Sequence, residues 1–243
     1  MRNRIFSMDN PKAAKAIDYG WLNAIHYMAP ATLGGVGDLC PNRTEACTAL
    51  CLGWTSGQAG MVSHDAQINS VRQSRIDKAQ RFMRDRAAYM RDVVRSIELA
   101  QAKARREGLR LCVRLNGSTD IGWEGVRTDD GRTLMQRFPD VQFTDYTKSP
   151  KRAMACAAGK FPANYHLCFS RSEANGNQCR DVLLAGGTVA AVFAGEKPES
   201  YLGFPVVDGD AHDLRHLDPR GHVVALSPKG LKAKRDTSGF VVR

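Results

Sequence analysis

Three cysteines within twelve residues are the feature of this sequence that most directly suggests chemistry. The segment 39–53 carries Cys40, Cys47 and Cys51. Cys47 and Cys51 are four residues apart, which predicts that they share one helical face, while Cys40 can fold back from the preceding loop. Three thiolates leave one position of a metal centre open, as catalytic sites require. The sequence therefore predicts a metal or iron–sulfur cluster site on these residues.

Zinc is the alternative metal for the same thiols. His64, in the loop that follows the cysteine segment, would complete a tetrahedral site. A structural zinc of this kind would belong to a nucleic-acid-binding protein. The Cys-x-x-Cys pairs typical of such sites are missing from the sequence.

A second group of candidate ligands lies near the C-terminus. Asp208, Asp210 and His212 follow a short apolar stretch, and acids at alternate positions of a strand end point the same way. With Asp120 and Asp145 they would bind magnesium or manganese in a hydrolase or nuclease, and His212 would act as general base. The structural alternative is an Asp-Gly turn followed by a helix N-cap.

Six short apolar stretches are the elements that would position these residues. The predicted strands are 109–115, 141–145, 165–169, 188–193, 205–207 and 222–226. Helical stretches at 151–158 and 178–185 alternate with them, which indicates parallel strands with right-handed crossovers. The predicted fold is an α/β protein, with the parallel strands in a partial or complete (β/α) barrel.

Polar residues gather where these predicted strands end. Because the carboxyl ends of parallel strands meet at one edge, we expect the polar residues to converge around one mouth. The candidate catalytic residues are Asp120, Lys148, Asp208, Asp210 and His212. The candidate cofactor-binding residues at these ends are Asn116, Ser118, Ser170 and Glu173. Turn formation is the alternative reading for Asn116, Ser118 and Asp120.

The first half of the chain is predicted to be loop and helix. An N-terminal segment over 1–38, with a short helix at 12–17, leads into the cysteine motif. A helical region over 66–108 follows, with a break near 84–86 and a C-cap at Gly108. Its basic residues at helical spacing predict a solvated face; they are Arg72, Arg75, Lys78, Arg81, Arg84 and Arg86. With the strand-helix units of 109–243, the sequence predicts one α/β domain over 1–243.

Composition and charge bound the partners and the compartment. The 243 residues are 43% hydrophobic and carry a net charge of +10. This charge suits an anionic small molecule or nucleic acid, and also plain solubility. No stretch reaches membrane-spanning length and no signal peptide is evident, which predicts a cytoplasmic protein with no membrane partner. In that reducing compartment, seven cysteines are expected as ligands, core residues or reactive thiols.

Five segments together resemble an uncharacterised family of bacteriophage and prophage proteins, over about 34–243. The segments are Leu39–Gly53, Val113–Glu124, Phe143–Lys148, Asn164–Ser172 and Val207–Asp213. The chain is also distantly similar to a phage-associated family related to radical S-adenosylmethionine enzymes. In that family a three-cysteine motif precedes a strand with a polar, Asp-containing end, and a later strand ends in Thr-Lys-x-Pro-x-Arg, which Thr147–Arg152 matches.

The second resemblance implies a partial α/β barrel that holds a [4Fe–4S] cluster near its mouth. The iron without a cysteine ligand would bind S-adenosylmethionine. Reductive cleavage of S-adenosylmethionine would then yield a radical that abstracts hydrogen from an anionic or nucleotide-derived substrate. Gly35 and Gly37 would let backbone amides approach the cluster sulfurs. The cysteines are separated by six and three residues, whereas the usual radical-enzyme pattern has three and two.

Overall fold

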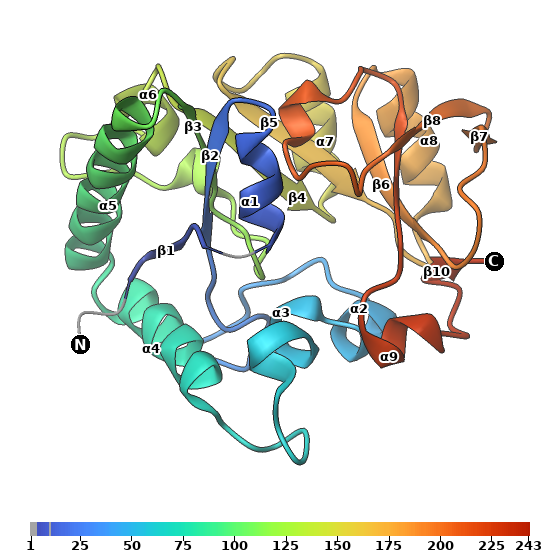
Figure 1. Ribbon diagram of the computed structural model, residues 1–243, viewed down its shortest axis with the longest axis horizontal. Coiled ribbons are helices and arrows are strands. Elements are labelled where there is room, and N and C mark those ends of the chain that lie inside the picture. The colour runs from blue at the N-terminus through green and yellow to red at the C-terminus, as the bar shows by residue number, and fades with distance from the viewer. Residues whose placement is uncertain (1–3, 10) are drawn as a thin grey trace.

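A ten-stranded, mostly parallel sheet forms the centre of the computed structural model, which describes residues 4–9 and 11–243 (Figure 1). The strand order is β1-β2-β3-β4-β5-β6-β9-β8-β7, and β10 pairs with β6. The strands are β1 (Phe6–Ser7), β2 (Trp21–His26), β3 (Arg110–Arg114), β4 (Gln142–Thr147), β5 (Tyr165–Ser170), β6 (Thr188–Phe193), β7 (Ser200–Tyr201), β8 (Phe204–Asp208), β9 (Val223–Leu226) and β10 (Val241–Val242). Only the pairs β1–β2 and β7–β8 are antiparallel among the described strands.

Helices cover both faces of the sheet and one of its edges. The α-helices are α1 (Pro11–Ile17), α2 (Glu45–Ala49), α3 (Leu52–Thr55), α4 (Ser70–Arg84), α5 (Arg86–Arg106), α6 (Leu134–Arg137), α7 (Pro150–Ala157), α8 (Gly176–Leu184) and α9 (Gly230–Lys234). Three 3₁₀ turns complete the set: η1 (Gly57–Gly60), η2 (Trp123–Gly125) and η3 (Arg215–Leu217). None of the helices in the described part of the chain has the length and apolar character needed to cross a bilayer.

The helices are distributed unequally over the two faces of the sheet, because β2 to β6 are adjacent in the sheet in the same order as in the chain. Right-handed crossovers between such strands place the connecting helices on the same face. Accordingly α5 packs on β3, α7 on β5 and α8 on β6. The main core lies between this face and α5, where Val113 and Phe143 meet Val93 and Ile97. The opposite face is covered by α1 and η3, with Ala16 and Leu214 against Trp21 and Cys112.

The structure confirms all six predicted strands and the predicted break in the long helix. The helical region predicted over 66–108 consists of two helices, α4 and α5, and the Asp85 side chain caps α5 by accepting a hydrogen bond from Ala88 N. Gly108 follows its last turn with φ +68°, the left-handed conformation expected after a C-cap. Strand β2 was not predicted, because all six of its residues are buried and no polar alternation marks it.

The strands do not close into a complete barrel within the described residues. The path of paired strands has two free ends, at β1 and β7. The prediction of parallel strand-helix units is therefore right, while the complete barrel is not formed by the residues described.

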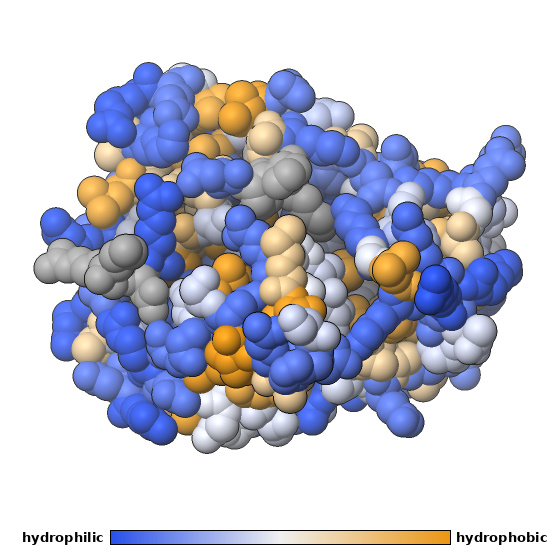
Figure 2. Space-filling view, turned by 60° about the horizontal axis from the view of Figure 1, so that its bottom comes forward, coloured by the Kyte–Doolittle hydropathy of each residue, from blue (hydrophilic) through white to orange (hydrophobic). Residues whose placement is uncertain are grey.

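The carboxyl edge of the sheet is covered by α2, α3 and α9, which lie together below the strands in Figure 1. Figure 2 shows the molecule with this side turned forward, and its surface there is mostly hydrophilic, with hydrophobic residues in small separate groups. The cysteine segment thus lies over the edge at which the predicted site residues leave the strands.

Candidate functional site

The cysteine segment is fixed to the loops that follow β3 and β5. Asp120 N donates to Leu39 O at 2.8 Å, and the Cys40 thiol lies 3.8 Å from Ser118 O. Thr44 Oγ1 donates to Glu173 Oε2 at 3.1 Å. Contacts across more than 70 residues of sequence therefore hold the cysteines at the ends of the central strands.

Cys47 and Cys51 do not share one helix, so that prediction is wrong. Helix α2 begins after Thr44, whose Oγ1 accepts a hydrogen bond from Cys47 N at 3.1 Å. It ends at Ala49, and Cys51 precedes α3 with φ −58° and ψ 105°, which is not helical. The chain turns between the two cysteines instead of continuing as one helix.

The three thiols are close enough to influence one another electrostatically. Burial, together with negative charge on Cys51 and Cys47, raises the pKa of Cys40 to about 12. Burial and negative charge on Cys47 raise the pKa of Cys51 to about 11, and burial also raises the pKa of Cys47. Without a bound cation all three are neutral thiols at neutral pH, so binding of a metal would release protons.

Lys148 is a cation that interacts electrostatically with Cys47. The strand register places Thr147 opposite Phe169, so Lys148 leaves β4 beside the end of β5. Its Nζ donates to Ser170 Oγ at 2.8 Å and lies 4.9 Å from the Phe240 ring. Burial lowers the pKa of Lys148, while negative charge on Cys47 would raise it.

Arg152 ties together the loops beneath Lys148. Its Nη1 lies 2.6 Å from Asp120 Oδ1 and its Nε 2.6 Å from Glu124 Oε1, and all three side chains are at most 17% exposed. The other oxygen of Asp120 accepts from Lys148 N at 2.9 Å. Asp120, predicted to be catalytic, thus holds the main chain under Lys148. The Thr147–Arg152 motif supplies both the cation and its support.

Two predicted cofactor-binding side chains are occupied by structural hydrogen bonds. The Asn116 amide donates to Ile121 O, and its oxygen accepts from Trp123 Nε1 at 3.1 Å. Ser118 Oγ donates to Met28 O at 2.6 Å. Both residues shape the loop after β3, as the turn-forming alternative expects, and their contacts with a cofactor stay a prediction.

Asp145, predicted as a possible metal ligand, lies in a buried hydrogen-bond network on the face of the sheet that α5 covers. Its carboxylate accepts from Asn116 N at 2.6 Å and from Tyr165 Oη at 3.0 Å. Burial raises the pKa of Asp145 to about 7, although these hydrogen bonds favour the ionised form. It supports the loop after β3 from below.

The glycine-rich loop packs on α4 and not on the thiols. Gly35 and Gly37 have φ +67° and +103°, which explains why glycine occupies both positions. Gln80 Nε2 donates to Gly34 O at 3.1 Å. The amide that reaches a thiol is that of Ala31, whose N lies 3.3 Å from Cys40 Sγ. The approach of the Gly35 and Gly37 amides to cluster sulfurs stays a prediction.

Two basic residues predicted to be solvated on α4 are buried. Lys78 is only 7% exposed, and Arg72 is fully buried, with its Nε 2.8 Å from Ala59 O and its Nη2 2.9 Å from Trp54 O. Arg75 Nη1 donates to Gly53 O. These guanidinium groups fix the chain that follows the cysteines, which composition and spacing alone did not indicate.

The acidic group after β8 forms a separate cluster of ion pairs. Asp208 and Asp210 both bind Lys197 Nζ, and Asp210 Oδ2 also accepts from Ser227 N at 2.8 Å. These hydrogen bonds lower the pKa of both carboxyls. The His212 ring packs 4.7 Å from that of Tyr19. Asp208 and Asp210 are thus held by Lys197 and by the main chain after β9, whereas Glu173 contacts the cysteine segment.

Comparison with known proteins places the chain in a family without revealing its activity. No curated protein and no solved structure matches it. The family model described as Gene product 88 matches residues 4–243, which include every element of the sheet. The chain belongs to the Gene product 88 family.

Proposed function

We propose that the protein binds a [4Fe–4S] cluster through Cys40, Cys47 and Cys51 and acts as a radical S-adenosylmethionine-like enzyme. The observation that carries this proposal is the convergence of three unpaired, partly buried thiols at the carboxyl edge of a parallel sheet. Lys148 lies beside them as a counter-charge. Three thiolates would bind three irons and leave the fourth open.

The proposed cluster and the zinc alternative make different demands on the placement of the thiols. The described residues contain no group of three or more His, Cys, Asp or Glu side chains placed to hold one metal ion. A zinc ion needs its ligands at about 2.0–2.3 Å, whereas the thiolates of a cluster bind different irons and stand farther apart. His64, the proposed fourth zinc ligand, is exposed in the loop after α3.

The residues around the thiols would tune and shield such a cluster. The Ala31 amide donates to Cys40 Sγ, and hydrogen bonds to cluster sulfurs stabilise the reduced state. The Lys148 ammonium offsets the negative charge of three thiolates. Glu173, joined to Thr44, and Ser170, joined to Lys148, hold the segment and the cation in fixed relation. The bound cluster would supply the electron and the open iron for cofactor cleavage.

The sheet supports the radical reading through its topology. The strands β2 to β6 are parallel and adjacent in chain order, which is the arrangement of a partial (β/α) barrel. The Thr-Lys-x-Pro-x-Arg element follows β4 and supplies Lys148 and Arg152. We infer a phage-encoded enzyme that works in the cytoplasm of a bacterial host, on an anionic or nucleotide-derived substrate.

Anaerobic purification with metal analysis tests the proposal. We would compare the wild type, the triple variant Cys40→Ala/Cys47→Ala/Cys51→Ala and the matched control Cys156→Ala, which alters a half-buried cysteine of α7. Iron, sulfide, zinc and the visible spectrum would be measured for each, and folding would be checked by circular dichroism.

Brown wild-type and control proteins with about four irons, and a folded colourless triple variant, are expected. Cleavage of S-adenosylmethionine by the reduced protein would then establish the radical activity. Stoichiometric zinc, or no metal in any of the three proteins, would overturn the proposal.

A further inference from the structure

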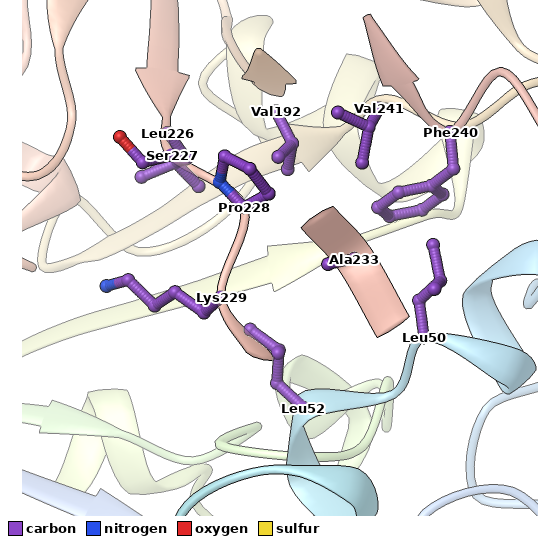
Figure 3. Close-up of a pocket in the computed structure, with 10 residues that line it drawn as sticks. All are labelled: Leu50, Leu52, Val192, Leu226, Ser227, Pro228, Lys229, Ala233, Phe240 and Val241. Atoms are coloured by element: carbon purple, nitrogen blue, oxygen red, sulfur yellow. The ribbon is translucent and has the colours of Figure 1, made fainter. Parts of the chain in front are cut away.

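Two neighbouring cavities, one with an apolar lining and one with basic residues in its wall, lie beside the cysteine segment; together they are called the groove, with the first as its inner end and the second as its outer end. Two cavities, of about 70 and 280 Å³, share Leu50, Lys229 and Ala233 in their walls. The smaller one lies between the cysteine segment and the C-terminal segment, beyond the ends of β6 and β9 (Figure 3). The two cavities are therefore neighbours that meet at these three residues.

The inner end of the groove is built for a small apolar group. Its walls are mainly aliphatic, with one aromatic ring; they include Leu50, Leu52, Val192, Leu226, Phe240 and Val241. In Figure 3 the side chains of Leu50, Leu52 and Phe240 lie around Ala233. The volume of about 70 Å³ is roughly half that of an engineered apolar cavity that binds benzene. A short aliphatic chain fits it better than an aromatic ring.

The outer end of the groove carries an excess of positive charge. Lys229 and Lys232 line it with one acid, Asp65, which already pairs with Lys232 at 3.1 Å. Arg72 also reaches this wall, but its nitrogens are bound to main-chain oxygens. Lys229 lines both cavities and is 44% exposed, with Asp210 Oδ1 3.6 Å from its Nζ. An anionic group entering the groove would meet Lys229 at the junction.

The inner end also adjoins the proposed cluster site. Leu50 and Leu52 flank Cys51 in the sequence, and Phe240 forms the aromatic contact of Lys148 at 4.9 Å. Arg171 Nη1 donates to Phe240 O at 2.8 Å and holds that segment against the sheet edge. An apolar group seated in this pocket would therefore lie next to the residues assigned to the chemistry.

We propose that the groove binds an aliphatic anion, with a short hydrocarbon chain in the inner pocket and a carboxylate or phosphate beside Lys229. The inference deepens the proposed function, since it identifies the class of substrate, and it rests on that function only for the claim that the ligand is the substrate. The shared chemistry is an aliphatic chain with an anionic head, whether in a free acid or at the end of a longer amphiphile.

Binding of a graded ligand series to the full-length protein tests the proposal. Acetate, butanoate, hexanoate and decanoate, together with hexyl phosphate and hexylammonium, would be titrated by calorimetry and ligand-observed NMR. Each added CH₂ is expected to strengthen binding about fourfold until the pocket is full. Hexylammonium, which has the same chain and the opposite charge, is expected to bind at least tenfold more weakly than hexanoate. Continued strengthening to decanoate would identify a longer amphiphile as the source.

Two variants separate the inner pocket from the basic end. Ala233→Leu would fill the pocket and abolish the dependence on chain length, while Lys229→Gln would weaken hexanoate and hexyl phosphate about tenfold. Lys151→Gln, on the exposed face of α7, is the matched charge control and is expected to bind like wild type. Folding of each variant would be checked by circular dichroism.

Equal binding of hexanoate and hexylammonium, or unchanged chain-length dependence in Ala233→Leu, would overturn the inference. Because iron content is measured separately, failure of the cluster proposal leaves a distinct signature: chain-length-dependent binding to a protein that holds no iron. A protein that holds iron but does not bind the ligand series would overturn the groove inference and leave the cluster proposal intact.

Discussion

Two groups of charged residues at the ends of strands differ in how they are built. Around the cysteine segment, Asp120, Arg152 and Lys148 are partly buried and connect loops from several strands. After β8, Asp208 and Lys197 form an ion pair in which the carboxylate is 59% exposed. A buried charge is retained only when the surrounding structure satisfies it, whereas an exposed pair contributes little. The charged residues around the cysteine segment are therefore held by buried, mutually satisfied contacts, as is typical of a functional site.

The largest effect is expected where a buried charge loses its partner. Arg152→Ala leaves Asp120 and Glu124 without their cation in a setting that is mostly shielded from water. We expect the free energy of unfolding to fall by about 3–5 kcal/mol. Urea denaturation followed by circular dichroism measures it. A loss below about 1 kcal/mol would show that this network is no more important than a surface pair.

The next effect concerns the arginine that fixes the segment after the cysteines. Arg72→Ala leaves the main-chain oxygens of Trp54 and Ala59 without their donor, and we expect a loss of about 2–4 kcal/mol. Arg81→Ala, on the exposed side of the same helix, is the control and is expected to cost less than about 1 kcal/mol. Thermal melts of both variants would decide; equal losses would contradict the anchoring role.

The pH dependence of stability separates Asp145 from the exposed acids. Because the folded-state pKa of about 7 exceeds the unfolded value of about 3.9, the stability contributed by this group is complete below pH 4 and is lost as the pH rises through 7. Asp145→Asn should lack this component, worth about 1–3 kcal/mol. Melting temperatures at pH 5 and pH 8 test this, and parallel profiles for wild type and variant would refute it.

The smallest effect is expected at the acidic group after β8. Lys197→Ala removes the cation shared by Asp208 and Asp210, yet we expect a loss of less than about 1 kcal/mol, because Asp208 is 59% exposed and Asp210 keeps Lys229 and Ser227 as partners. Iron content should equal that of wild type. A drop in iron content would show that the acidic group after β8 contributes to metal binding at the cysteine segment, and the two regions would then not be independent.

Local patterns were enough to predict much of the fold. The six strands of the second half, the break at Asp85 and the turn at Gly108 follow from apolar periodicity and capping chemistry, which act over a few residues. Strand β2 was not predicted, because a fully buried strand has no polar alternation. The strands β1, β7 and β10 have two residues each and are too short to show a pattern in the sequence.

The sequence by itself determined the parallel strand-helix architecture and the family, and it marked the three cysteines as candidate ligands. Only the tertiary structure decided which polar strand ends meet. It brought Lys148, Ser170 and Glu173 to the cysteine segment and directed Asp208 and Asp210 to Lys197. It also turned Arg72 inward. These outcomes depend on contacts between residues far apart in the chain, which residue type and spacing do not specify.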